Sequence, residues 1–269
     1  MDLAIVYMVA GVSSRFGGRI KQFAKVGPEG ESLIEYSLKQ ALKAGFNKII
    51  FIVGKKTKDI FKEKFKDSFL DVPVYYAYQN YNENERDKPW GTVDALCSIK
   101  EIVDCPLVVC NGDDIYGEET FSILSEHLLG KNEEATVGYE LGEVIPDKGA
   151  VHRAIFEIDE EGYVKDLNEV FNINKSNLDA TNTKHDDLCS MNVFALFPET
   201  IKKLNERLEF FKFMNRGSRT AECLLPNEVN QLIKMNKIKL KIYPSSGKWF
   251  GITNPEDEEA VRGALRKFD

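Results

Sequence analysis

Short apolar segments alternate with amphipathic segments over the first 110 residues, and this pattern constrains the fold more than any other feature of the sequence. Residues 2–10, 48–53 and 106–110 are mostly apolar, as expected for strands that are buried on both faces of a parallel sheet. The segments between them have the spacing of helices. We therefore predict an α/β fold with a doubly wound, mainly parallel sheet and right-handed crossovers.

Three helices and a further strand are expected between these strands. The first helix begins at Ser32 and continues to Gly45, because Ser32 and Glu35 have the spacing of a capping box and apolar residues recur on one face. The other expected elements are a helix over 57–69, a strand over 72–79 and a helix over 92–103.

The pattern changes to an α+β arrangement after about residue 130. Residues 152–158 and 163–167 flank a polar turn and predict a β-hairpin. The later expected elements are a strand over 189–197, a helix that begins at Pro198 and a final helix that begins at Pro255. The polar segment 172–187 has no periodicity, and we interpret it as a mobile loop.

Composition excludes several classes of protein. A formal net charge of -7 argues against general binding of nucleic acid, which requires a broad basic surface. No apolar run approaches the roughly 20 residues that cross a bilayer, and the N-terminus does not resemble a signal peptide, so we expect a cytoplasmic protein without a membrane partner. Five cysteines without a CxxC motif indicate reduced core residues rather than a disulfide framework.

Residues 11–25, directly after the first strand, combine three glycines, two serines and four cations. Ligands of doubly wound sheets bind at the carboxyl ends of the strands, where this loop begins. Glycines allow backbone N–H groups to face an anion, and Arg15 and Lys21 can neutralise phosphate charge. The loop therefore predicts a polyphosphate site, although it matches neither the P-loop nor the dinucleotide-binding pattern. The alternative is a flexible surface loop with solvated charges.

Asp113 and Asp114 follow the strand 106–110 and form a second candidate site. Two adjacent carboxylates suit Mg²⁺, which keeps several waters and also binds substrate phosphate. Side chains alternate across a strand, so only one of the pair is expected to face the ligand. The structural alternative is a turn or a helix cap.

The two loops together resemble the sugar-phosphate nucleotidyltransferases, also called nucleoside-diphosphate-sugar pyrophosphorylases, which have a Rossmann-like nucleotidyltransferase fold. The similar segments are, in chain order, 11–22, 26–31, 33–37, 88–92, 111–114 and 248–253. The resemblance implies a single domain over 1–269, with a nucleotide-binding half over 1–130 and an acceptor-binding half over 131–269.

The resemblance also implies roles for individual residues. Arg15, Lys21 and Asp113 correspond to the catalytic residues, with Asp113 as the ligand of Mg²⁺. The implied nucleotide-binding residues are Ala10, Gly11, Ser13, Ser14, Gln79, Gly91, Thr92 and Asp114. Glu169 and Asn192 are similar to residues of the sugar pocket, and Arg153 and Lys248 are candidates for a further cation in the acceptor site.

Three features depart from the family pattern. Gly251 stands where a second metal-binding aspartate is typical, and Val170 stands where a lysine often follows the sugar-binding glutamate. No segment after Asp269 corresponds to the β-helix that some relatives append, so we expect no acetyltransferase activity.

The expected reaction condenses a nucleoside triphosphate with a sugar 1-phosphate and releases pyrophosphate. An amide such as that of Gln79 can both donate and accept, which favours UTP. Alternatives are transfer to a non-sugar phosphate, a glycosyltransferase with a related fold, and a regulatory module that binds nucleotide without turnover. His127, His152 and His185 are scattered and are interpreted as surface or packing residues.

Overall fold

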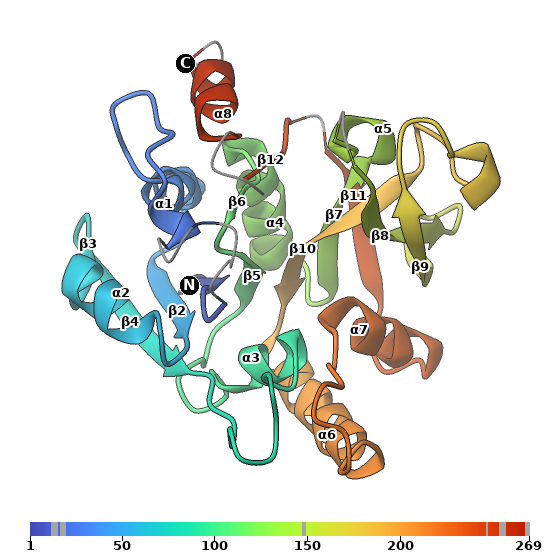
Figure 1. The fold of residues 1–269 in the computed structure, drawn as a ribbon, viewed down its shortest axis with the longest axis horizontal. Helices are drawn as coiled ribbons and strands as arrows, with labels where there is room; N and C mark the ends of the chain where they lie inside the picture. The colour runs from blue at the N-terminus through green and yellow to red at the C-terminus, as the bar shows by residue number, and fades with distance from the viewer. Residues whose placement is uncertain (12–15, 17–19, 147–148, 246, 253–256, 267–269) are drawn as a thin grey trace.

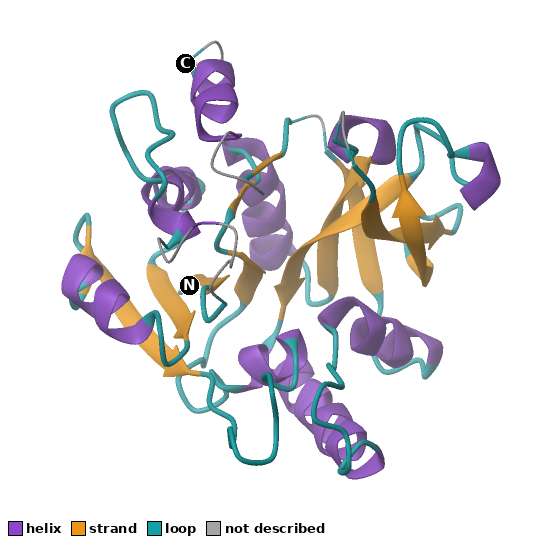
Figure 2. Cartoon of the chain, viewed as in Figure 1, coloured by secondary structure: helices purple, strands orange, loops and turns teal. Residues whose placement is uncertain are grey.

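A central β-sheet with helices on both of its faces forms the body of the molecule (Figures 1 and 2). The computed structural model describes residues 1–11, 16, 20–146, 149–245, 247–252 and 257–266. The strands are β1 (Ala4–Met8), β2 (Lys48–Val53), β3 (Ser68–Phe69), β4 (Val72–Tyr78), β5 (Leu107–Asn111), β6 (Asp114–Ile115), β7 (Glu134–Glu140), β8 (Val151–Ile158), β9 (Val164–Ile173), β10 (Leu188–Leu196), β11 (Leu240–Pro244) and β12 (Phe250–Gly251). The α-helices are α1 (Leu33–Lys43), α2 (Lys58–Phe65), α3 (Thr92–Cys97), α4 (Glu118–Gly130), α5 (Leu141–Val144), α6 (Pro198–Met214), α7 (Leu225–Lys234) and α8 (Asp257–Leu265), and two short 3₁₀ helices are η2 (Lys21–Phe23) and η3 (Asp179–Thr181).

The main path of the sheet has the strand order β11-β7-β10-β5-β1-β2-β4-β3. Strand β1 pairs in parallel with β2 and β5, and β2 pairs in parallel with β4. Strand β10 is antiparallel to β5 and β7, its neighbours on this path, and it also pairs antiparallel with β8, whereas β7 and β11 are parallel. The mainly parallel α/β sheet that the sequence predicts is confirmed. The second half of the chain extends this sheet by β10, which is antiparallel to β5, and then by β7 and β11.

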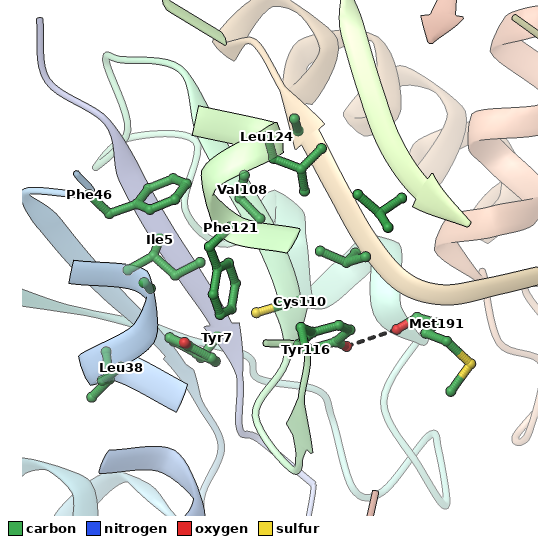
Figure 3. Close-up of a cluster of buried hydrophobic side chains, with 14 of the residues drawn as sticks. Ile5, Tyr7, Leu38, Phe46, Val108, Cys110, Tyr116, Phe121, Leu124 and Met191 are labelled. Carbon is green, nitrogen blue, oxygen red and sulfur yellow. Dashed lines mark hydrogen bonds between the residues drawn. The ribbon is translucent and has the colours of Figure 1, made fainter. Parts of the chain in front are cut away.

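Alternation along β1 divides the core into two layers. Ile5 and Tyr7 pack with apolar residues of α1, α2 and α4, while Val6 packs on the other face with residues of α3, α6 and α7. Figure 3 shows the first layer, in which Phe121 lies close to the strands. Burying each large apolar side chain contributes about 1.5–3 kcal/mol, which is why both faces of the central strands are covered.

Helix α1 begins with the predicted capping box. The Ser32 side chain accepts a hydrogen bond from the Glu35 backbone N–H, and the Glu35 carboxylate accepts one from the Ser32 backbone N–H. The expected helix over 57–69 is too long, because α2 ends at Phe65 and β3 forms a tight hairpin with β4. Leu70 and Asp71 at its turn both have positive φ, at 49° and 64°. The absence of glycine or asparagine at this turn explains why the sequence did not predict it.

The helix expected over 92–103 is also shorter than predicted. Helix α3 ends at Cys97, and the next residues form tight turns in which Ile99 N–H donates to the Leu96 carbonyl and Ile102 N–H donates to the Ile99 carbonyl. Bonds of this i to i−3 type are typical of 3₁₀ turns, so the apolar periodicity continues without a regular α-helix.

The second half contains the predicted hairpin as β8 and β9, and α6 begins at the predicted Pro198. Residues 174–187 contain η3 and are anchored by the buried side chains of Leu178 and Thr183. Pro255 lies outside the described residues. All five cysteines are buried and free, as predicted. In the described part of the chain, no helix combines the length and apolar character needed to cross a membrane.

Candidate active site

The end of β1 lies between the ends of β2 and β5, and two glycines allow this close approach. A Cβ on Gly54 would lie 2.8 Å from the Ala10 carbonyl oxygen, and a Cβ on Gly112 would lie 3.2 Å from the Met8 carbonyl oxygen. Gly11 itself faces open space. Ala10 and Gly11 are therefore at the carboxyl edge of the sheet, as predicted for a ligand-binding loop. Ser13, Ser14 and Arg15 lie outside the described residues.

Lys21 and Asp113 join the two loops that the sequence singled out. Lys21 Nζ donates to Asp113 Oδ2 at 2.8 Å across 92 residues of sequence. Their side chains are 13% and 35% exposed, so the Asp113 carboxylate remains partly accessible. The short helix η2, which carries Lys21, is held in place by Phe23, whose ring packs on Phe61 with ring centroids 4.9 Å apart. One cation and one carboxylate thus meet at the sheet edge.

Asp114 lies deeper than Asp113. Its carboxylate accepts a hydrogen bond from Asn111 Nδ2 at 2.9 Å and lies 3.3 Å from the Tyr116 hydroxyl. The same hydroxyl lies 2.8 Å from the Met191 carbonyl oxygen, a contact drawn in Figure 3. Burial, and then the charge of Asp113, raise the pKa of Asp114 to about 7. Tyr116 therefore ties the loop to β10, and Asp114 is buried beside this contact.

A cavity of about 290 Å³ opens beside these carboxylates. It is lined by Asn111, Asp113, Asp114, Val151, His152, Arg153, Ala154, Glu169, Ser190, Met191, Asn192, Pro226 and Trp249. Five of the predicted residues come together here from the β5–β6 turn, β6, β8, β9 and β10, namely Asp113, Asp114, Arg153, Glu169 and Asn192. Lys248 is exposed and is not among the described residues that line the cavity.

Three buried polar atoms around this cavity have no hydrogen-bond partner within the described residues. They are Arg153 Nε, Asn192 Oδ1 and Trp249 Nε1. An unsatisfied buried donor or acceptor costs about 1–3 kcal/mol, so two donors and one acceptor concentrated around one cavity indicate a place for a polar ligand.

Backbone geometry turns Asn192 out of the regular ladder. Its φ is +58°, and the register of β10 with β7 shifts between Ser190 and Phe194. Asparagine is among the few residues that tolerate this left-handed conformation. Irregular strand geometry of this kind is frequent next to binding sites, where it redirects a side chain.

Glu169 supplies a half-buried carboxyl group to the same cavity. Burial raises its pKa, and the nearby charges of His152 and Arg153 partly offset that rise. The His152 ring accepts a hydrogen bond from the Asn172 backbone N–H at 3.0 Å and packs on Phe171. Glu169 is therefore positioned to accept hydrogen bonds from a ligand.

Gly251 lies directly opposite Asp114 in the β12–β6 pair. A Cβ at this position would overlap the Trp249 indole and lie 3.1 Å from Asp114 Oδ1. An aromatic ring thus occupies the side where a second carboxylate is typical of the family. In the described part of the chain, no group of three or more His, Cys, Asp or Glu side chains could hold a metal.

Gln79 and Gly91 meet at a separate point of the sheet edge. Gln79 Nε2 donates to the Gly91 carbonyl oxygen at 3.0 Å and to Asp94 Oδ2 at 3.1 Å. Gly91 has a φ of +102°, and a Cβ there would lie 2.5 Å from the Cys223 carbonyl oxygen. Thr92 Oγ1 accepts a hydrogen bond from Leu225 N–H at 2.8 Å and so ties α3 to α7. This group does not line the cavity beside Asp113.

Sequence reasoning did not assign several residues that line the cavity. The polar or aromatic ones are Asn111, His152, Ser190 and Trp249, and the sequence analysis interprets His152 as a surface or packing residue. Trp249 stood within a similar motif at 248–253, which was the available signal. The contribution of Met191 depends on a backbone carbonyl, for which a sequence gives no sign.

Residues 18–169 match the sequence model of the nucleotidyl transferase family. Solved structures share the fold. A UDP-glucose pyrophosphorylase complexed with UDP-glucose is 16% identical, with 100% of each chain covered and a TM-score of 0.70. A putative glucose-1-phosphate thymidylyltransferase from Bacillus anthracis is 17% identical, with 99% of this chain and 96% of that chain covered and a TM-score of 0.71.

An inositol-1-phosphate CTP transferase from T. maritima is 14% identical, with 99% of this chain and 97% of that chain covered and a TM-score of 0.68. The comparison with curated proteins gave no match.

Proposed function

This chain belongs to the nucleotidyl transferase family, and from that premise we propose that it condenses a nucleoside triphosphate with a sugar 1-phosphate and releases pyrophosphate. The observation that carries the proposal is the cavity that extends from Asp113 to Glu169 and Asn192. It places a partly exposed carboxylate, paired with Lys21, beside a pocket that contains unsatisfied polar atoms. A phosphorylated polar acceptor fits such a cavity.

The nucleotide is assigned to the sheet edge around the loop after β1. Ala10 and Gly11 would contact the phosphates with backbone N–H groups, and Ser13, Ser14 and Arg15 would continue that contact. Gln79, Gly91 and Thr92 would bind the base, for which we favour uracil. Two structural relatives were solved with UDP-glucose and with UTP bound, which supports this choice of base.

Asp113 is the residue assigned to Mg²⁺. Its accessible carboxylate and the absence of a second carboxylate at Gly251 fit an ion that keeps water and substrate phosphates as its other ligands. When bound, such an ion would neutralise negative charge on the phosphates that react.

The protein's own part in the reaction is positioning and charge neutralisation. A sugar 1-phosphate is ionised at neutral pH, so its oxygen can attack the α-phosphorus without a general base, and pyrophosphate leaves with the bonding electron pair. Lys21 would stabilise negative charge between the two phosphate groups, and Arg15 would do so on the leaving pyrophosphate. Glu169 and Asn192 would hold the acceptor in place for in-line attack.

Arg153 is assigned the cationic role that a lysine at position 170 often has in the family. Arg153 pairs with Val170 in the β8–β9 ladder, so its guanidinium comes from the neighbouring strand. Its Nη1 donates to the His152 carbonyl and its Nε has no partner in the described residues. Lys248 is the second candidate for contact with the acceptor.

A non-sugar acceptor is the second candidate function. One structural relative is named for transfer to inositol 1-phosphate, which is a polyol phosphate rather than a sugar phosphate. The mixture of donors and acceptors around the cavity suits hydroxyl groups of either class. A regulatory module that binds nucleotide without turnover is the third candidate, and Gly251 is the feature that favours it.

The test is acceptor-dependent release of pyrophosphate, measured with each common nucleoside triphosphate, Mg²⁺, and a panel of sugar 1-phosphates and polyol phosphates. We expect release with one triphosphate and one class of acceptor. Asp113→Asn should lower kcat on the order of 10²-fold or more, by analogy with loss of a preorganised electrostatic contact.

Glu169→Gln tests the acceptor site, and His185→Ala is the control. Glu169→Gln should raise KM for the acceptor while nucleotide binding stays unchanged, and His185→Ala should leave both parameters near the wild-type values. Turnover of Asp113→Asn at the wild-type rate would contradict the assignment. Nucleotide binding without any release of pyrophosphate would favour the regulatory module.

A further inference from the structure

Asp94 fixes the direction in which the side-chain amide of Gln79 faces. Gln79 Nε2 donates to two oxygens, the Gly91 carbonyl at 3.0 Å and Asp94 Oδ2 at 3.1 Å. Both oxygens are acceptors only, because a backbone carbonyl and an ionised carboxylate carry no proton to donate. The reversed amide would place Gln79 Oε1 against two acceptors. Both N–H groups of Nε2 are therefore committed to the protein.

Lys212 holds Asp94 in this arrangement from a different helix. Lys212 Nζ lies 3.0 Å from Asp94 Oδ1, and the two side chains are 29% and 10% exposed. Helix α3, which carries Asp94, packs directly on α6, which carries Lys212. The Lys212 ammonium occupies Asp94 Oδ1, so Asp94 Oδ2 is the oxygen that accepts the hydrogen bond from Gln79.

Gln79 is left with one group for a ligand, which is the carbonyl oxygen Oε1. Within the described residues, no donor forms a hydrogen bond with this oxygen. Gln79 directly follows β4, at the same carboxyl edge of the sheet as Gly11. An acceptor at this place can bind only a ligand that offers an N–H or O–H group.

We propose that the Asp94–Lys212 pair is a positioning element that makes Gln79 a hydrogen-bond acceptor and thereby selects nucleobases with a protonated ring nitrogen. This inference rests on the proposed function, from which it takes the contact of Gln79 with the base. Uracil and thymine carry N3–H and guanine carries N1–H, whereas cytosine and adenine have an unprotonated nitrogen at the same edge. With the ring nitrogen held opposite Gln79 Oε1, an acceptor faces an acceptor, and cytosine or adenine satisfies Oε1 only by shifting to present its exocyclic amino group. We expect this to disfavour cytosine and adenine on the order of 10- to 100-fold.

The test is nucleotide binding by calorimetry without an acceptor substrate, using UTP, dTTP, GTP, CTP, ATP and N3-methyl-UTP. The wild-type protein should bind a triphosphate with a ring N–H most tightly. N3-methyl-UTP should bind at least about 10-fold more weakly than UTP, because methylation removes the donor. Tightest binding of CTP or ATP, or equal binding of UTP and N3-methyl-UTP, would overturn the inference.

Asp94→Asn supplies a donor as well as an acceptor to Gln79, so the amide can reverse. The ratio of UTP to CTP affinity should fall about 10-fold or more in this variant, and Lys212→Met should move it in the same direction. Lys202→Met is the control, because it removes an exposed lysine of the same helix that pairs with Glu199. A purely structural role for Asp94 would weaken both nucleotides equally and leave the ratio unchanged, which would also overturn the inference.

Pyrophosphate release is measured separately on the same proteins. Discrimination between UTP and CTP in binding, without release by any variant, would leave this inference intact and contradict the proposed reaction. Release of pyrophosphate together with an unchanged ratio of UTP to CTP affinity in Asp94→Asn would support the proposed reaction and contradict this inference.

Discussion

The Trp249 indole occupies the space into which a side chain at Gly251 would project. A Cβ on Gly251 would lie 2.5 Å from Trp249 Cζ2 and 3.1 Å from Asp114 Oδ1. The absence of a carboxylate at position 251 is therefore coupled to the presence of the indole at position 249. The effect of a substitution at one of these positions therefore depends on which residue occupies the other.

Gly251→Asp tests the relationship between Trp249 and Gly251. We expect it to lower the free energy of unfolding by about 1–3 kcal/mol, because overpacking forces the indole out of its place. The added carboxylate would also repel that of Asp114. Chemical denaturation measures the loss, and Trp249→Ala/Gly251→Asp should recover part of it. A stable single variant that needs less Mg²⁺ for activity would show instead that the site accepts a second carboxylate.

Lys21→Met and Asp113→Asn should have different effects on the Mg²⁺ requirement. Lys21 competes with an incoming ion for the Asp113 carboxylate, since the two side chains are 2.8 Å apart. Lys21→Met should lower kcat by about 10²-fold or more without raising the Mg²⁺ concentration for half-maximal activity. Asp113→Asn should raise that concentration. Titrations of pyrophosphate release with Mg²⁺ distinguish the two variants, and equal shifts in both would contradict the assigned roles.

Glu35 should make the stability of the protein depend on pH in the acid range. Partial burial acts to raise its pKa, but hydrogen bonds from Lys64 and Ser32 outweigh burial and lower the pKa to about 2. A depressed pKa in the folded state means that the stabilisation is complete above about pH 4.5, the ordinary value. It is lost as the pH falls toward 2.

The measurement is the thermal midpoint between pH 6 and pH 2. Glu35→Gln should show a shallower decline than the wild type, and Lys64→Met should shift the decline to higher pH. Glu83→Gln is the control, because its ion pair with Lys55 is exposed and contributes little. Parallel curves for Glu35→Gln and the wild type would rule out this source of acid sensitivity.

Arg86 should be among the most sensitive residues of the chain to substitution. Arg86 is 4% exposed, and its guanidinium donates to the carbonyls of Lys88, Ser218 and Ala221. The guanidinium lies 3.4 Å from the Trp90 ring centroid. Arg86→Met should lower the free energy of unfolding by about 2–4 kcal/mol, because it leaves three partly buried carbonyls without their donors. The loop that carries Gly91 would lose its support.

Urea denaturation of Arg86→Met and Arg219→Met tests this expectation. Arg219 pairs with Asp87 near the same loop but is 48% exposed, so its removal should cost about 1 kcal/mol or less. Similar losses for the two variants would mean that burial of Arg86 does not set its contribution.

The parallel core could be predicted because burial on both faces leaves a direct trace in the sequence. Ile5, Val6 and Tyr7 are consecutive and all fully buried, since neighbouring side chains enter opposite layers. The position of β10 could not be predicted in the same way. A run of apolar residues does not reveal which strands will be its neighbours or in which direction it pairs.

The candidate site was predictable where a residue carries its chemistry in its own side chain. Asp113, Glu169 and Asn192 were singled out, and all three line one cavity. Trp249 was missed because its place depends on the glycine two residues later. The relation of Asp94 to Lys212 was missed because it joins two helices that lie far apart in the sequence.

Strand β10 lies between β5 and β7 although it follows both of them in the chain. During synthesis on a ribosome, one edge of β5 therefore waits for its partner until residues 188–196 have emerged, and an open edge of this kind is a template for wrong pairing. Asn192 and the Met191 carbonyl that accepts the Tyr116 hydrogen bond belong to the late strand. A nascent chain stalled before this point would already contain the glycine-rich loop and both aspartates, yet it would have no acceptor cavity.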